Sequence, residues 1–148
     1  MRTCYSALST VLASLGFAVF CLSAAAEQRP KVEDAAFACS KAEGCVYFFD
    51  LNKKSPAFRN ALQAGAKASG IRFHPSVFDG PASPMPVRQI EGRRAVMGGS
   101  CEAHNCEHNV QVLYYEEPRR LVGIYSDRDY RKHPFGNPTP NELRALSK

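Results

Sequence analysis

The strongest constraint on the fold comes from residues 109–115, NVQVLYY, whose side chains alternate as in a β-strand. Successive side chains of a strand point to opposite faces, so one face carries Val110, Val112 and Tyr114 and the other carries Gln111, Leu113 and Tyr115. A turn containing Pro118 follows, and residues 120–126, RLVGIYS, return as the next strand. Two earlier strands are predicted at 87–90 and 93–97. The four segments together predict an antiparallel meander.

Helices are predicted on both sides of these strands. Ser55 and Pro56 have the pattern of an N-cap and a first helical position, and an apolar face repeats from Phe58 to Ala66 before Gly70 ends the helix. Residues 35–41 indicate a short helix, whereas 46–51 could be a strand or a buried helical turn. Residues 139–142, TPNE, have the form of a capping box for a helix that ends at Leu146. We therefore expect an α+β fold, with helices packed on one face of the meander.

The first 26 residues have the layout of a secretory signal peptide. Arg2 is followed by an apolar stretch, 11–22, and then by small residues up to Ala26, after which the chain becomes polar. The apolar stretch is shorter than the roughly 20 residues that a membrane span requires. We expect cleavage near Ala26, a single domain over 27–148, no membrane span in the mature protein and a periplasmic location.

The cysteine count agrees with export. Four cysteines remain after cleavage, and an even number in an exported chain predicts two disulfides with three alternative pairings. Closeness in sequence favours Cys39 with Cys45 and Cys101 with Cys106. Cleavage removes one Arg and no acidic residue, so the net charge falls from +5 to +4. The basic residues are scattered rather than grouped, which argues against a nucleic-acid partner.

The segment CEAHNC, from Cys101 to Cys106, is the most distinctive candidate site. A metal site could draw on Cys101, His104, Cys106 and His108, but an oxidising compartment favours a disulfide and the spacing matches no zinc module. Redox dithiols usually have two residues between their cysteines, and a Cys–His nucleophile needs a free thiolate. A structural disulfide carrying a surface His is the remaining alternative. We expect no cofactor, no metal and no enzymatic activity, and we expect His108 to face water.

With a strand before it and NVQVLYY and RLVGIYS after it, CEAHNC resembles the loop of the Ivy family, inhibitors of vertebrate lysozyme, which carries Cys-Lys-Pro-His-Asp-Cys in this setting. The resemblance extends upstream to VYFFDLNKKSPAFRNALQAG. It implies a periplasmic inhibitor, not an enzyme, that inserts this loop into the cleft of a c-type lysozyme or a related peptidoglycan-cleaving enzyme. It also implies that the chain can form a homodimer.

The resemblance assigns partner binding to the four residues between the cysteines: Glu102, Ala103, His104 and Asn105. His104 matches the family's loop His, which contacts the catalytic carboxylates of the enzyme. The other three depart from the family, with Glu for Lys, Ala for Pro and Asn for Asp. These departures support an alternative, in which the protein is a divergent periplasmic binding protein that recognises another envelope partner, such as a lytic transglycosylase, without inhibiting lysozyme.

Overall fold

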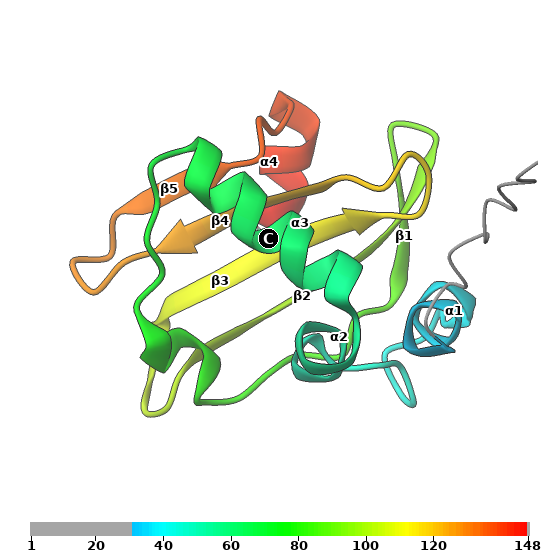
Figure 1. Cartoon of the computed structure of the whole chain (residues 1–148), viewed down its shortest axis with the longest axis horizontal. Helices are drawn as coiled ribbons and strands as arrows, with labels where there is room; N and C mark the ends of the chain where they lie inside the picture. The colour runs from blue at the N-terminus through cyan, green and yellow to red at the C-terminus, as the bar shows by residue number, and fades with distance from the viewer. Residues whose placement is uncertain (1–30, 148) are drawn as a thin grey trace, which may run out of the picture.

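The computed structural model describes residues 31–147. The predicted signal peptide, 1–26, lies outside these residues. Five antiparallel strands form one sheet in the order β1-β2-β3-β4-β5, which confirms the predicted α+β fold with a meander (Figure 1). The strands are β1 (Val87–Ile90), β2 (Arg93–Glu102), β3 (Asn105–Tyr115), β4 (Leu121–Ser126) and β5 (Lys132–Phe135).

Three helices cover one face of the sheet: α1 (Lys31–Ala38), α2 (Phe48–Lys54) and α3 (Pro56–Ala68). The largest core lies beneath them, where Phe58 of α3 packs edge-on against Tyr114 with ring centroids 5.1 Å apart. Val110 and Val112 lie in this same core, so the predicted alternation of β3 is correct. The undecided segment 46–51 is mostly helical, because Phe48 and Leu51 share the buried side of α2.

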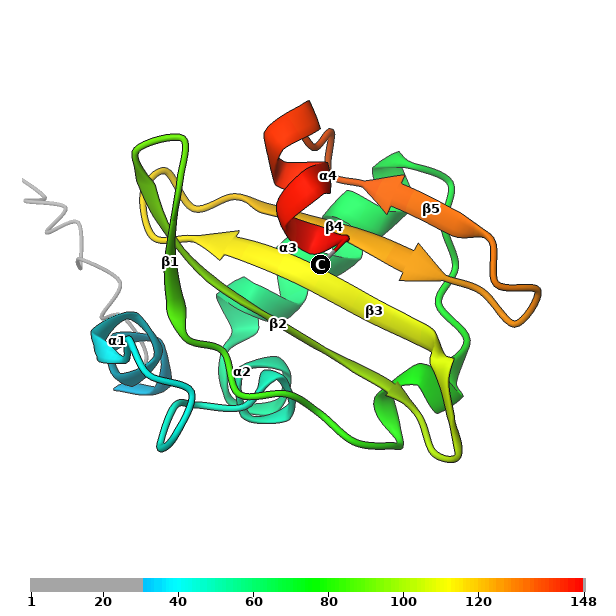
Figure 2. The same cartoon turned by 180° about the vertical axis from the view of Figure 1, so that it is seen from behind.

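The fourth helix, α4 (Pro140–Leu146), packs against the opposite face of the sheet (Figure 2). The position of α4 differs from the prediction that the helices pack on one face of the sheet. Leu113 and Tyr115 of β3 point to this side and form a smaller core with Leu146. Because both faces of β3 are covered toward its end, Leu113 and Tyr115 are buried on this face as Val112 and Tyr114 are on the other, while Gln111 stays partly exposed.

The predicted helix caps are confirmed. The Ser55 hydroxyl accepts a hydrogen bond from the Phe58 amide, and Pro56 occupies the first helical position. Thr139 and Glu142 form the reciprocal capping box at the start of α4. By contrast, the sequence does not predict β5, because a four-residue strand containing Pro134 gives no clear alternation. Proline is tolerated there because β5 is an edge strand.

Both favoured disulfides are present, Cys39–Cys45 and Cys101–Cys106, with Cα–Cα distances of 5.4 and 4.8 Å. The first joins the end of α1 to the segment before α2. The second closes the turn between β2 and β3. Within residues 31–147, no helix combines the length and the apolar character needed to cross a membrane.

Candidate functional site: the disulfide-closed hairpin

The turn between β2 and β3 is a tight β-hairpin whose outermost residues are Ala103 and His104. Glu102 pairs with Asn105 across the two strands, and the Cys101–Cys106 disulfide closes the base of the turn. Ala103 and His104 are exposed, and the His104 backbone is left-handed, with φ of 63°. Such a conformation is uncommon for a residue other than glycine, although His, Asn and Asp are enriched in it. The fold thus presents the His104 imidazole at the end of a closed turn.

An irregularity in β3 lies directly behind this turn. Cys101 pairs with Asn109 while the next residue, Glu102, pairs with Asn105, so residues 106–108 have no counterpart on β2. The Asn109 side chain stabilises the bulge by donating to the carbonyls of Cys106 and Glu107, at 2.8 and 3.0 Å. β-bulges commonly redirect side chains next to functional sites. Here the Glu102 and His108 side chains at the bulge both point toward the body of the protein.

The hairpin rests on the short 3₁₀ helix η1 (Pro75–Phe78) and on the segment that follows it. The Ser100 hydroxyl donates to the Val77 carbonyl at 2.8 Å, and the Cys101 amide donates to the Pro81 carbonyl at 3.1 Å. Gly80 lies so close that a Cβ atom there would be 2.3 Å from the Cys101 carbonyl oxygen and 2.4 Å from the Ala103 nitrogen. Only glycine allows this approach, so the hairpin is supported by backbone as well as by side chains.

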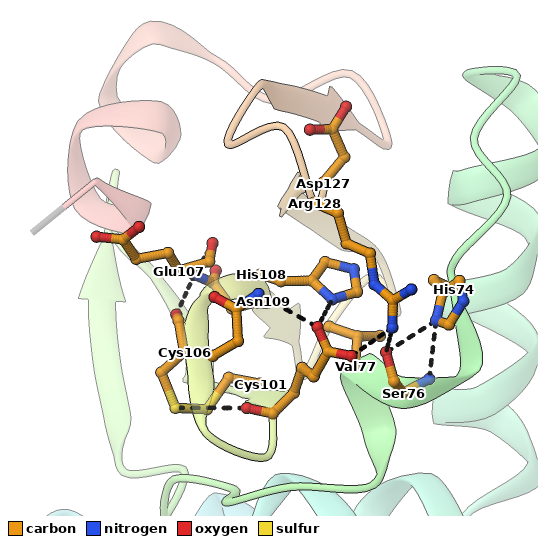
Figure 3. A network of polar contacts seen from close by, with 12 residues as sticks. His74, Ser76, Val77, Cys101, Cys106, Glu107, His108, Asn109, Asp127 and Arg128 are labelled. Carbon is orange, nitrogen blue, oxygen red and sulfur yellow. Dashed lines mark hydrogen bonds and ion pairs between the residues drawn. A yellow bond between two sulfur atoms is a disulfide. The ribbon is translucent and has the colours of Figure 1, made fainter.

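The Glu102 carboxylate links the turn of the hairpin to the bulge in β3 and to the loop between β4 and β5. Oε2 accepts from His108 Nδ1 at 2.9 Å and from Asn105 Nδ2 at 3.3 Å, while Oε1 accepts from Arg128, which also donates to the Ser76 hydroxyl. Figure 3 shows Arg128 and His108 converging on this part of the hairpin. The hydrogen bonds from Arg128 and His108 lower the pKa of Glu102 from 4.5 to about 2. The carboxylate is therefore ionised at neutral pH and neutralised from within the protein.

His108 continues this network into the core. The expectation that His108 faces water is wrong, because its side chain is fully buried. Its Nδ1 donates to the ionised Glu102, which leaves Nε2 to accept from the Tyr125 hydroxyl at 3.0 Å. The Tyr125 oxygen in turn accepts from the His74 amide at 3.3 Å. A continuous chain of hydrogen bonds thus runs from η1 through β4 to the hairpin.

The loop between β4 and β5, residues 127–131, lies beside the hairpin. The Asp127 carboxylate accepts from the amides of Asp129 and Arg131, at 2.9 and 3.0 Å, and contacts His133 Nε2 at 2.7 Å. The hydrogen bond from His133 lowers the pKa of Asp127; partial burial opposes this effect, and the two backbone amides add to it. Arg128, in the same loop, is the residue that reaches Glu102.

The structure separates the four predicted loop residues into two groups. Ala103 and His104 point outward, and no hydrogen bond to the His104 side chain is found among the described residues. Glu102 and Asn105 bond to each other, and Glu102 is directed at the body of the protein. A contribution of Glu102 to partner contact remains a prediction, but its carboxylate is already engaged internally.

The buried network around His108 was not predicted from the sequence, although strand alternation gives one signal for it. His108 lies two residues before Val110, on the face of β3 that continues to Val112 and Tyr114, so strand alternation alone places it on the covered face. Arg128 and Tyr125 are 26 and 17 residues from their partners, and no local pattern announces such contacts.

The hairpin presents the exposed imidazole of His104 beside an oxidised pair of cysteines. Both cysteines are joined to each other, and His108 is enclosed. Among the described residues, no group of three or more His, Cys, Asp or Glu side chains could hold a metal ion. The fold and site define a class: an α+β protein whose central strands present a disulfide-closed hairpin. Comparisons with protein-family models, curated proteins and solved structures found no match.

Proposed function

We propose that this protein is a periplasmic inhibitor that inserts the hairpin tip, with His104, into the cleft of a lysozyme-type peptidoglycan-cleaving enzyme. The observation that carries the proposal is the exposed His104 imidazole at the end of a disulfide-closed turn. A loop that is already ordered loses little conformational freedom on binding, which favours insertion into a concave partner. The resemblance to the Ivy family supports the same role.

The chemistry of the cleft explains why a His suits this position. A retaining muramidase uses one protonated carboxylic acid and one carboxylate that are about 5 Å apart. Imidazole has nitrogen atoms on opposite edges of its ring, so one His104 side chain can hydrogen-bond toward both carboxyl groups. Occupation of that place excludes the substrate. The inhibitor itself carries out no reaction, and the proposal therefore includes no enzymatic activity.

The internal pairing of Glu102 supports this binding mode. A free carboxylate beside two acidic groups of an enzyme would be repelled or would have to take up a proton. Here Arg128 compensates the charge of Glu102, and His108 and Asn105 occupy its other oxygen. The side chains that remain outermost, Ala103 and His104, carry no negative charge. The departure from the family's Lys at this position is therefore compatible with an acidic cleft.

The net charge favours a second candidate partner. The mature chain carries +4, and lysozymes of the animal type are commonly basic, so long-range repulsion would slow their encounter. A lytic transglycosylase or another envelope enzyme of lower charge would not meet this barrier. The second proposal is thus a periplasmic binding protein that uses the same hairpin on such an enzyme.

The test is an inhibition assay with the purified mature protein against a c-type lysozyme and a lytic transglycosylase. We expect His104→Ala to raise the inhibition constant at least tenfold. His104→Asn removes the imidazole but suits the left-handed backbone, so an equal loss in both variants would assign the effect to the ring. If the wild-type protein at micromolar concentration leaves both enzymes fully active, the proposal is wrong.

A further inference from the structure

The exposed tip of the hairpin is too small to hold a protein partner alone. Between Cys101 and Cys106, only Ala103 and His104 are exposed. A stable protein–protein interface usually buries about 800 Å² on each partner, which involves roughly 20–30 residues on each side. A complex that forms at the hairpin must therefore also use the surface beside it.

The loop between β4 and β5 provides that neighbouring surface. Arg128 contacts both Glu102 of the hairpin and Ser76 of η1, so residues 127–131 are tied to the hairpin on one side and to η1 on the other. Figures 1 and 2 both show the β2–β3 turn, η1 and the β4–β5 loop at the same end of the molecule. The opposite flank of the hairpin, residues 81–83, offers no exposed large apolar side chain.

Tyr130 is the large exposed hydrophobic residue of this loop. Its side chain is 57% exposed, more than Phe49 at 52% and Tyr47 at 47%, the other large exposed hydrophobic residues in the described part of the chain. Tyrosine is enriched among residues that dominate binding energy, because its large ring makes contact with only two torsions to restrict. A solvated Tyr at the end of a loop is therefore a good candidate for a contact residue.

The loop presents Tyr130 in a defined conformation. The Tyr130 backbone is left-handed, with φ of 62°, and its amide donates to the Asp127 carbonyl at 2.9 Å. The Asp127 carboxylate holds the amides on both sides of Tyr130, those of Asp129 and Arg131. Like the hairpin tip, this loop is ordered by its own contacts. Little further ordering would be required on binding.

A pocket of about 400 Å³ lies between this loop and residues 72–75, which lead into η1. Its lining includes Arg72, Phe73, His74, Pro75, Arg128 and Asp129, so it combines an aromatic floor with charges of both signs. A single side chain from a partner protein could enter it. Arg128, which lines the pocket, contacts Glu102 of the hairpin, and Asp129, which also lines it, directly precedes Tyr130.

We infer that residues 127–131, led by Tyr130, are a second contact loop that binds the rim of the same enzyme cleft that His104 enters. This inference rests on the proposed function. The occupant is the folded surface of the peptidoglycan-cleaving enzyme, because the loop is continuous with the hairpin through Arg128 and the hairpin alone lacks sufficient area.

The test measures the dissociation constant of the mature protein for a c-type lysozyme and for a lytic transglycosylase by surface plasmon resonance. For the enzyme that binds, we expect Tyr130→Ala to weaken binding at least tenfold, mainly through faster dissociation. Tyr130→Asn should do the same, because it removes the ring while suiting the left-handed backbone. Phe49→Ala is the matched control: it removes a ring of similar exposure from α2 and should leave affinity unchanged.

The two proposals fail in distinguishable ways. If His104→Ala weakens binding tenfold but both Tyr130 variants stay within twofold of wild type, the second contact loop is wrong and the hairpin proposal stands. If Phe49→Ala weakens binding as much as Tyr130→Ala, the loop has no special role and the inference is also overturned. If wild-type protein binds neither enzyme, the function and the inference fail together.

Discussion

Two carboxylates, those of Glu142 and Glu102, form hydrogen-bond networks at opposite ends of β3. Glu142, in the first turn of α4, is fully buried and accepts from Arg120 and the Tyr115 hydroxyl, both at 2.6 Å. Glu102 is partly exposed at the hairpin, where it accepts from Arg128 and His108. Burial alone would raise the pKa of Glu142, but the hydrogen bonds from Arg120 and Tyr115 lower it below its usual value.

The difference shows how one kind of interaction can serve two purposes. The Glu142 network fastens a helix to a sheet, and the carboxylate at its centre is fully buried. The Glu102 network fastens a turn whose neighbouring residues remain exposed. We therefore expect damage at Glu142 to reduce global stability, and damage at the hairpin to reduce binding more than stability.

The largest expected effect belongs to Glu142→Ala. It leaves the buried Tyr115 hydroxyl without its acceptor, which typically costs about 1–3 kcal/mol, and it removes the capping-box partner of Thr139, which typically costs about 1 kcal/mol more; Arg120 keeps its bond to the Asn137 carbonyl. Urea unfolding should report this loss, while the affinity of the remaining folded protein for its partner should stay near wild type. A loss below 1 kcal/mol would contradict the structural role assigned to this network.

Gly80→Ala tests the backbone support of the hairpin. The added methyl group would lie 2.3 Å from the Cys101 carbonyl oxygen, so the hairpin must shift. Overpacking of this kind usually costs about 1–3 kcal/mol. Because the hairpin shifts, we also expect the folded variant to bind its partner more weakly than the wild-type protein does. Gly70→Ala is a useful contrast, because its added methyl group meets no neighbour and only its left-handed backbone is strained.

Removal of the hairpin disulfide by the double substitution Cys101→Ser and Cys106→Ser should cost about 2 kcal/mol, from the entropy of so short a closed loop. The loss of affinity should be greater than in a variant lacking the Cys39–Cys45 disulfide, which lies away from the tip. Unfolding and binding measurements on the same two variants give the comparison. Equal losses of affinity would show that closure of the hairpin has no special importance for binding.

Glu102→Gln should have the smallest effect on stability at neutral pH and a distinct pH dependence. Because the folded-state pKa is lowered to about 2 from 4.5, the wild-type carboxylate contributes stability above pH 4.5 and loses that contribution as the pH falls toward 2. The difference in unfolding free energy between wild type and variant should therefore shrink over this range. Glu107→Gln, a neighbouring exposed carboxylate, is the control for removal of one negative charge. A difference in unfolding free energy that does not change with pH would contradict the pairing of Glu102 with Arg128 and His108.

Much of the fold was predictable because its signals are local. Alternation in 109–115 located β3, Ser55 and Thr139 located the starts of two helices, and closeness in sequence favoured the correct cysteine pairs. The fifth strand and the position of α4 were not predictable in this way, since both depend on packing against β4.

The candidate site was predictable only in its outer part. The spacing of two cysteines around His104 indicates an exposed closed turn. The orientation of Glu102 depends on Arg128 and His108, which reach it only after β3 and β4 have paired. A charge that appears repulsive in the sequence is therefore compensated by tertiary structure.

The inward direction of Glu102 has a consequence for protein engineering. Of the four residues between the hairpin cysteines, two maintain the turn and two, Ala103 and His104, are exposed. The hairpin therefore resembles a scaffold with two exposed positions, already ordered and closed by a disulfide, of which position 104 favours residues that suit a left-handed backbone. A library randomised at these two positions alone would alter the choice of target while leaving the core and the supporting contacts of the domain intact.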